Sequence, residues 1–325
     1  MQGQRTYYFK EGFVLLSVIL FEKLVSLYFI IAIGAIITKT GIIDSTDSKV
    51  LSKLLIYVIN PCMIVSSLQI NASNDVIEGL KISFLAALVL QSLMIAVVYI
   101  ANKFLHFNKI EQLCLEYPNV GSIIIPIVSS VLGKEYIIYT LGFIVIENIL
   151  LWTHAKMVIS GENKVSIIKI IKNPTIIAIL FSFSLMFLKI KIPMVLMESI
   201  DSINLMIGPI AMFIIGIILG GMNVKKEASK KRLWLTILGR LVLLPFFCFC
   251  ALIVCKIPAA EMQIRKILFI TFLGVCAPVA NSIASLADVY GGDKDYPCAI
   301  SILSTLSSIV SMPVFVYFYQ KVFAI

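Results

Sequence analysis

The sequence predicts an all-α membrane protein with about ten transmembrane helices in two inverted five-helix repeats. Hydrophobic residues make up 60% of the 325 residues and charged residues 14%, whereas soluble domains contain roughly 45–50% and 25%. The apolar runs are long, as in membrane helices, whereas outer-membrane barrels have short alternating segments. Two of the runs, one in each half, are interrupted by a proline at matching places.

A window of about 20 residues, the length that crosses a bilayer, gives the helices in order. In the first half we expect them at 19–38, 50–69, 80–101, 111–132 and 136–158, and in the second half at 173–188, 195–221, 232–255, 264–290 and 296–320. Residues 1–18 form an N-terminal extension and residues 160–172 a short polar linker. The two repeats therefore cover residues 19–159 and 173–325.

The fourth and ninth helices carry the two interruptions. Pro118 precedes Asn119 in the fourth, and Asn281 follows Pro278 in the ninth. Proline removes a backbone donor and clashes with the carbonyl one turn back. Hydrocarbon offers the freed carbonyls no partner, so such breaks persist inside protein or beside a water-filled cavity. We therefore expect the two broken helices to cross near the middle of the membrane and to line a site there.

The second helix of each half also carries matching residues, Ile59-Asn60-Pro61 and Ile207-Gly208-Pro209. An odd number of helices per half places the halves in opposite orientations, which makes the repeat inverted. Chance is the competing explanation, because proline and glycine are common in membrane helices.

Charge predicts the orientation and excludes some partners. The net charge is +9, but the basic residues lie between apolar runs, where they set topology, so no nucleic acid is expected as a partner. Loops after odd-numbered helices carry more Lys and Arg, the densest being 225–232. Those loops should be cytoplasmic and both termini outside, in a multi-pass protein of the cell membrane. The seven cysteines follow no metal or disulfide pattern and are interpreted as packing residues.

Taken in order, these motifs resemble the auxin efflux carrier family, within the bile-acid/sodium symporter-like superfamily. The similar residues are Pro118-Asn119 with Pro126 and Gly133, Gly208-Pro209 with Gly216, Arg240 with Pro245, Pro278 with Ala287 and Tyr290, and Ser304-Thr305-Leu306 with Pro313. Plant PIN carriers of this family have a proline at the position of Ile283, a basic residue at that of Asp288, and a long central loop. The resemblance therefore implies the fold, and not auxin itself as the substrate.

The resemblance implies a secondary active transporter that works by alternating access. Helices one, two, six and seven would form a scaffold that also makes a homodimer contact. Helices three to five and eight to ten would form a transport domain. The expected partners are the lipid bilayer and a small organic anion, a carboxylate that is auxin-like or a dicarboxylate.

Interrupted helices suit an anion because each half-helix N-terminus presents unpaired amides and a partial positive charge. The candidate substrate-binding residues are Pro118, Asn119, Gly121, Pro126, Pro278, Asn281 and Ser282. Asn119 and Asn281 could donate to the substrate. The alternative is that they only satisfy the carbonyls freed by the breaks, because buried polar groups must be paired.

An ionisable group inside a membrane helix indicates function by default. The candidates for ion coupling are Glu147, Asn148 and Asp288. Glu147 could carry a coupling proton, because burial favours the neutral carboxyl group, or it could bind Na⁺. The alternative is a structural hydrogen bond. Glu116 and Arg240 are interpreted as interfacial or snorkelling groups.

A channel or a membrane ligand sensor on the same fold is the alternative function. An enzyme is not expected, because the sequence contains no HExxH, no GxSxG and no paired aspartates in facing helices. It also contains no nucleotide-binding P-loop, and no cofactor is expected beyond a coupling H⁺ or Na⁺.

Overall fold

The computed structural model describes residues 21–22, 24–69, 73–161, 172, 174–255, 257, 260–289 and 295–324. This part of the chain is helical throughout and contains no β-strand, apart from one isolated bridge between Pro118 and Val279. Six of its helices are long and apolar enough to cross a membrane, and two shorter apolar helices accompany them. The predicted N-terminal extension and most of the linker lie outside the described residues.

The first half contains helix at each of the five predicted places. Its elements are the first helix (Leu24–Lys39), α2 (Ser48–Leu54) and α3 (Asn60–Leu68) joined by a π-helical turn at Leu55–Ile59, α4 (Asn74–Leu105), α5 (Lys109–Glu116), α6 (Val120–Val131), α7 (Thr140–Leu150) and, after a π-helical turn at Leu151–Ala155, α8 (Lys156–Ser160). A 3₁₀ helix at Lys134–Tyr139 leads into α7.

The second half also contains helix at each predicted place. Its elements are α10 (Pro174–Phe187), α11 (Met194–Asn204), α12 (Ile207–Gly221), α13 (Val224–Ala228), α14 (Lys231–Leu238) and α15 (Leu244–Val254) joined by a π-helical turn at Gly239–Leu243, α16 (Met262–Cys276), α17 (Ser282–Val289) and α18 (Asp295–Phe323).

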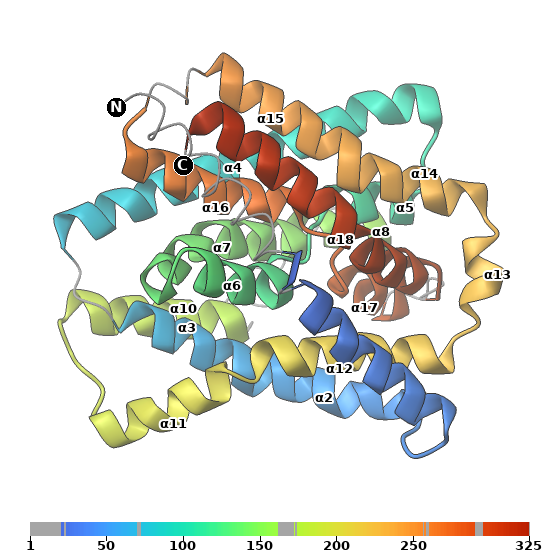
Figure 1. Cartoon of the computed structure of the whole chain (residues 1–325), viewed down its shortest axis with the longest axis horizontal. Helices are drawn as coiled ribbons and strands as arrows, with labels where there is room; N and C mark the ends of the chain where they lie inside the picture. The colour runs from blue at the N-terminus through green and yellow to red at the C-terminus, as the bar shows by residue number, and fades with distance from the viewer. Residues whose placement is uncertain are drawn as a thin grey trace, which may run out of the picture.

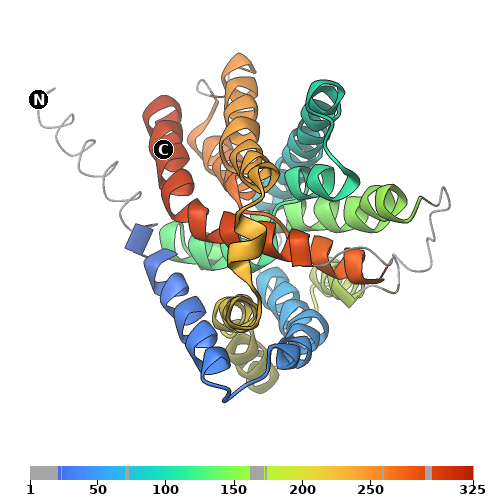
Figure 2. The same cartoon turned by 90° about the vertical axis from the view of Figure 1, so that its right-hand side faces the viewer.

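The helices form two groups, with α6, α7 and α17 between them (Figure 1). The first helix, α2, α3, α10, α11 and α12 lie together on one side, where α3 packs against α10 and α11, and α2 against α12. The helices α4, α5, α14, α15, α16 and α18 lie on the other side. The perpendicular view separates the same two groups (Figure 2). We call them the lower and the upper group, after their positions in Figure 1.

Small residues allow the first helix to cross α12 closely. A Cβ atom on Gly216 would lie 2.3 Å from the carbonyl oxygen of Ile31 and 2.9 Å from the Cα of Gly34. No side chain fits there, so glycine on both helices brings the two backbones into contact. Such small-residue crossings pack helices where lipid provides no hydrophobic drive for association.

Candidate functional site

The two predicted interruptions are present and lie against each other. Between α5 and α6, and again between α16 and α17, the chain leaves the helical conformation at the predicted proline. The two extended segments form an antiparallel bridge: the Asn119 amide donates to the Pro278 carbonyl at 2.7 Å, and the Ala280 amide to the Tyr117 carbonyl at 2.9 Å. Each break therefore satisfies part of the backbone of the other.

Arg240 satisfies most of the remaining carbonyls. It lies in the π-helical turn between α14 and α15 and is fully buried. Its guanidinium donates to the carbonyls of Leu115 at 2.9 Å, Val275 at 2.7 Å and Ala277 at 3.0 Å. One rigid side chain thus joins the C-terminal ends of α5 and α16, where helices leave their last carbonyls unpaired.

Three neutral side chains bind further backbone groups at the breaks. The Gln91 amide on α4 donates to the Glu116 carbonyl at 2.8 Å. On α18, the Ser304 hydroxyl accepts from the Val279 amide at 3.1 Å, and the Ser301 hydroxyl donates to the Val279 carbonyl at 2.9 Å. The crossing is therefore held mainly by α4, α18 and the α14–α15 helix, all from the upper group.

A cavity of about 550 Å³ opens beside the crossing, between the lower group and the helices α6, α7 and α17. The first residues of α6 and of α17 reach it, so two half-helix N-termini meet one space. The polar residues that line it are Ser52, Tyr57, Asn60, Asn119, Glu147, Asn148, Lys172, Thr175, Asn281 and Ser282. Apolar residues such as Ile64 and Leu286 form much of the remaining wall.

The two asparagines differ in their partners. The Asn119 side-chain nitrogen is buried and has no hydrogen-bond partner among the described residues. The Asn281 side-chain oxygen accepts from the Ser301 hydroxyl. Since Arg240 and the serines pair the backbone at the breaks, the Asn119 amide is left as a donor beside the cavity.

The structure brings together most of the predicted site residues. Asn119, Gly121, Asn281 and Ser282 line the cavity, and so do the predicted coupling residues Glu147 and Asn148. The Asn148 side chain donates back to the Ile144 carbonyl of its own helix at 2.8 Å. The binding and coupling roles of these residues stay predictions.

The remaining predicted residues lie elsewhere. Pro118 and Pro278 belong to the bridge and are not among the residues that line the cavity. Pro126 faces α12, where a Cβ atom on Gly208 would lie 3.3 Å from its ring. Asp288 is on α17, but its side chain lies outside the described residues, as does Tyr290.

The interpretation of Glu116 and Arg240 as interfacial groups was wrong. Their exposed fractions are 4% and 0%. Hydropathy shows only that a charged residue lies near an apolar run. It does not show that the two breaks expose polar backbone groups in the interior, which a buried charged side chain can bind. The arginine binds that backbone, whereas one carboxyl oxygen of Glu116 is buried without a hydrogen-bond partner among the described residues.

Comparison with known proteins identifies the family. A sequence model described as membrane transport protein matches residues 19–164 and 158–316, which is most of the chain. The chain belongs to this membrane transport protein family. The match confirms the resemblance to auxin efflux carriers and the transmembrane character. A search of curated proteins found no match.

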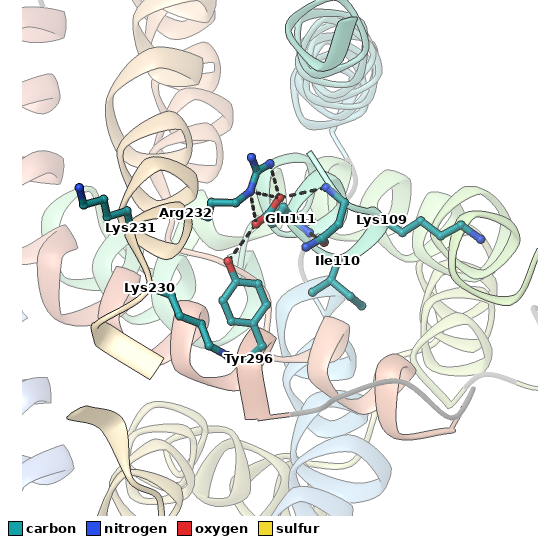
Figure 3. A pocket seen from close by; sticks show the side chains of 8 residues that line it. Lys109, Ile110, Glu111, Lys230, Lys231, Arg232 and Tyr296 are labelled. Atoms are coloured by element: carbon teal, nitrogen blue, oxygen red, sulfur yellow. Dashed lines mark hydrogen bonds and ion pairs between the residues drawn. The ribbon is translucent and has the colours of Figure 1, made fainter. Parts of the chain in front are cut away.

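The membrane transport protein also contains a second polar cluster, at the far end of α5 from the crossing (Figure 3). Glu111 is 1% exposed and accepts from its partners at 2.8 to 3.1 Å: Arg232 of α14, Tyr296 of α18 and the Asn108 amide. Arg232 also donates to the His106 carbonyl after α4 at 2.9 Å. This Glu111 cluster joins four elements of the upper group.

Proposed function

We propose that this membrane transport protein is a secondary active transporter that moves a small organic anion by alternating access. The observation that carries the proposal is the meeting of two half-helix N-termini and the unpaired Asn119 amide at one cavity. Helix N-termini attract anions through their free amides and partial charge of about half a unit. The amide and the two N-termini offer donors for a carboxylate.

The composition of the cavity supports an organic anion over an inorganic one. Lys172 adds a positive charge at the wall, and Glu147 is the acidic residue among those that line it. Much of the remaining surface is apolar, which suits the carbon skeleton of an auxin-like carboxylate or a dicarboxylate. A small inorganic anion would leave that surface unused.

We further propose ten transmembrane helices in two inverted repeats. The two matched stretches of the family model meet at residues 158–164, beside the linker that separates the predicted repeats. The two breaks also occur in the fourth helix of each half. The lower group would be the scaffold, with helices one, two, six and seven and the homodimer contact. Helices three to five and eight to ten would be the transport domain, that is, the upper group with α6, α7, α8 and α17. This domain would move relative to the scaffold and carry the cavity wall with it.

Transport against a gradient needs a coupling ion, and the proposal gives Glu147 this role. It is 8% exposed, lines the cavity and has no hydrogen bond to its carboxyl group among the described residues. A carboxyl group in that position can bind H⁺ or ligate Na⁺.

A two-step experiment tests the function. Purified protein is first screened against organic acids by thermal shift, because a ligand that binds the native state raises its apparent stability. The best ligand is then offered to proteoliposomes with and without a pH or Na⁺ gradient. Accumulation above the equilibrium level supports a secondary transporter. Equilibration without accumulation supports a channel, and binding without flux supports a ligand sensor.

Orientation has its own test. We propose that the 225–232 loop is cytoplasmic and both termini lie outside, on the bias of Lys and Arg. Ser229 of this loop is exposed, and so is Cys255 at the other end of the eighth predicted helix, 232–255. In intact cells an impermeant thiol reagent should label the native Cys255. It should not label Ser229→Cys in a protein that also carries Cys255→Ser. The reverse pattern would invert the topology.

A further inference from the structure

Glu116 is a buried carboxyl group that the crossing does not use. It is the last residue of α5, and its exposed fraction is 4%. One carboxyl oxygen, Oε2, is buried without a hydrogen-bond partner among the described residues. The nearest basic nitrogen is His154 Nδ1, 3.6 Å from Oε2. Such a carboxylate is expensive to keep charged in the interior, so its protonation state matters to the protein.

His154 gives this carboxyl group a route out of the interior. It lies in the π-helical turn after α7, where 32% of its side chain is exposed. The Tyr117 hydroxyl contacts His154 Nδ1 at 3.0 Å and the Leu150 carbonyl at 3.1 Å. A carbonyl only accepts, so in the tautomer in which the hydroxyl donates to Leu150, His154 Nδ1 carries a hydrogen of its own. The Nδ1 hydrogen therefore lies beside both Tyr117 and Glu116.

We propose that Glu116 and His154 form a proton-binding pair, a second protonation site behind the cavity wall in addition to Glu147. The imidazole takes a proton at Nε2, and its Nδ1 hydrogen faces Glu116 Oε2. The imidazolium and the carboxylate then form an ion pair. One proton has been bound, and the pair no longer carries a net charge.

The surroundings favour this pair over other partners for Glu116. Other titratable or charged groups on α5, on its packed neighbours and on the α7–α8 helix include Glu111, Cys114, Glu147, Lys156, Arg232, Arg240, Asp288 and Tyr296. Glu111 and Arg232 bind each other, and Arg240 faces the carbonyls of the breaks. Lys156 has another interaction, and the Asp288 side chain lies outside the described residues. Within the described part of the chain, His154 is the basic side chain within 4.0 Å of Glu116.

The pair also has a place in the proposed transport cycle. The Tyr117 hydroxyl contacts His154 Nδ1, and the Tyr117 carbonyl accepts from the Ala280 amide at the cavity wall, so one residue joins the pair to the cavity. Once it has bound a proton, the pair carries no net charge. The helices that the proposed function requires to move in the membrane then carry one negative charge fewer. The coupling role therefore rests on the proposed function, whereas proton binding by the pair does not.

The sequence contains two histidines, which makes the test direct. His106 has a backbone φ of 51°, a conformation that asparagine tolerates, so His106→Asn leaves His154 as the one imidazole. With labelled histidine, nuclear magnetic resonance follows the protonation of His154 from pH 5 to 9 in purified protein. Loss of a carboxylate at this distance should lower the midpoint of the His154 titration by about one pH unit or more in Glu116→Gln.

Glu111→Gln in the same background is the matched control, because it makes the same change on the same helix. Its His154 midpoint should stay within a few tenths of a unit of the parent. If Glu116→Gln does not fold, Glu116→Asp withdraws the carboxyl group and should lower the midpoint by a smaller amount. An unchanged midpoint in the folded Glu116 variant, or an equal change in Glu111→Gln, would overturn the pair.

Transport is measured separately on the same proteins. The titration needs no substrate, so it reads the pair even if the chain proves to be a channel or a sensor. With a transported anion in hand, Glu116→Gln should lose accumulation driven by a pH gradient and keep exchange of internal for external anion. Retained pH-driven accumulation would remove the coupling role from the pair.

Discussion

The helix α5 carries two buried carboxylates with opposite surroundings. Glu111, near its start, accepts from an arginine, a tyrosine and a backbone amide (Figure 3). Glu116, at its end, has one oxygen without a partner and a histidine 3.6 Å away. Both are at most 4% exposed. Burial alone therefore does not separate these two carboxylates, whereas the count of donors does.

The same contrast extends to the regions around them. Seven buried side-chain atoms in the described part of the chain have no hydrogen-bond partner, and three of these belong to Gln91, Glu116 and Asn119 at the crossing. The Glu111 cluster contributes none. Folded proteins rarely leave buried polar atoms unpaired. Concentration of the exceptions at the crossing indicates that this region is shaped for a ligand or a proton as well as for stability.

The largest expected effect is on the paired carboxylate. Glu111→Gln keeps the shape but removes the charge that Arg232 and Tyr296 bind, so the free energy of unfolding should fall by about 2–4 kcal/mol. Glu116→Gln should change it by less than about 1 kcal/mol, since no hydrogen bond to Oε2 is lost. Denaturation of both variants in the same detergent makes the comparison. Equal losses would mean that Glu116 is paired as fully as Glu111.

The sequence predicts where the two breaks lie, but it does not predict which buried charges are paired. Proline in an apolar run is a local signal, so Pro118 and Pro278 predicted both breaks and the residues beside them. Arg240 was misread because its acceptors are distant: it binds Leu115 across 125 positions. The approach of His154 to Glu116 likewise depends on how α5 packs against the end of α7. Local polarity predicts where a site lies, and tertiary contacts decide which charges are paired.

The next effect concerns the unpaired donor. Asn119→Ala removes the amide that faces the cavity, and a hydrogen bond to a charged ligand contributes roughly 1.5–3 kcal/mol. Anion affinity should therefore fall by about tenfold to a hundredfold. Stability should hardly change, because the side-chain nitrogen has no hydrogen-bond partner among the residues that the structure describes.

Asn204→Ala is the control for this measurement. Its amide donates to the Ser66 hydroxyl at 3.3 Å, outside the cavity, so affinity should be unaffected. A loss of stability with unchanged affinity in Asn119→Ala would return Asn119 to a structural role. Asn281, which already binds Ser301, should show a mixture of the two effects.

A third substitution compares the cavity carboxyl group with the other two. Glu147→Gln keeps the hydrogen-bonding shape but cannot ionise, so it should abolish accumulation driven by a pH gradient and leave anion exchange measurable. Glu111→Gln protein that survives purification should retain the pH dependence, since its carboxylate is held by Arg232. Uptake by proteoliposomes across a range of pH values measures both. Unchanged pH dependence in Glu147→Gln would make that residue structural.

The smallest effect should come from Tyr117, whose hydroxyl contacts His154 of the proton-binding pair. Tyr117→Phe removes the hydroxyl that contacts His154 and the Leu150 carbonyl, at a cost of about 0.5–1.5 kcal/mol in stability. The ring stays, so the backbone bridge through the Tyr117 carbonyl should survive.

Without the hydroxyl, His154 Nδ1 keeps Glu116 as its acceptor, and the imidazole can turn to bind the Glu116 carboxylate at hydrogen-bond distance. The His154 titration midpoint, measured in the His106→Asn background, should therefore move by a few tenths of a unit in the direction opposite to its change in Glu116→Gln. A change in the same direction as in Glu116→Gln would show that Tyr117, and not Glu116, is the group that controls the His154 proton.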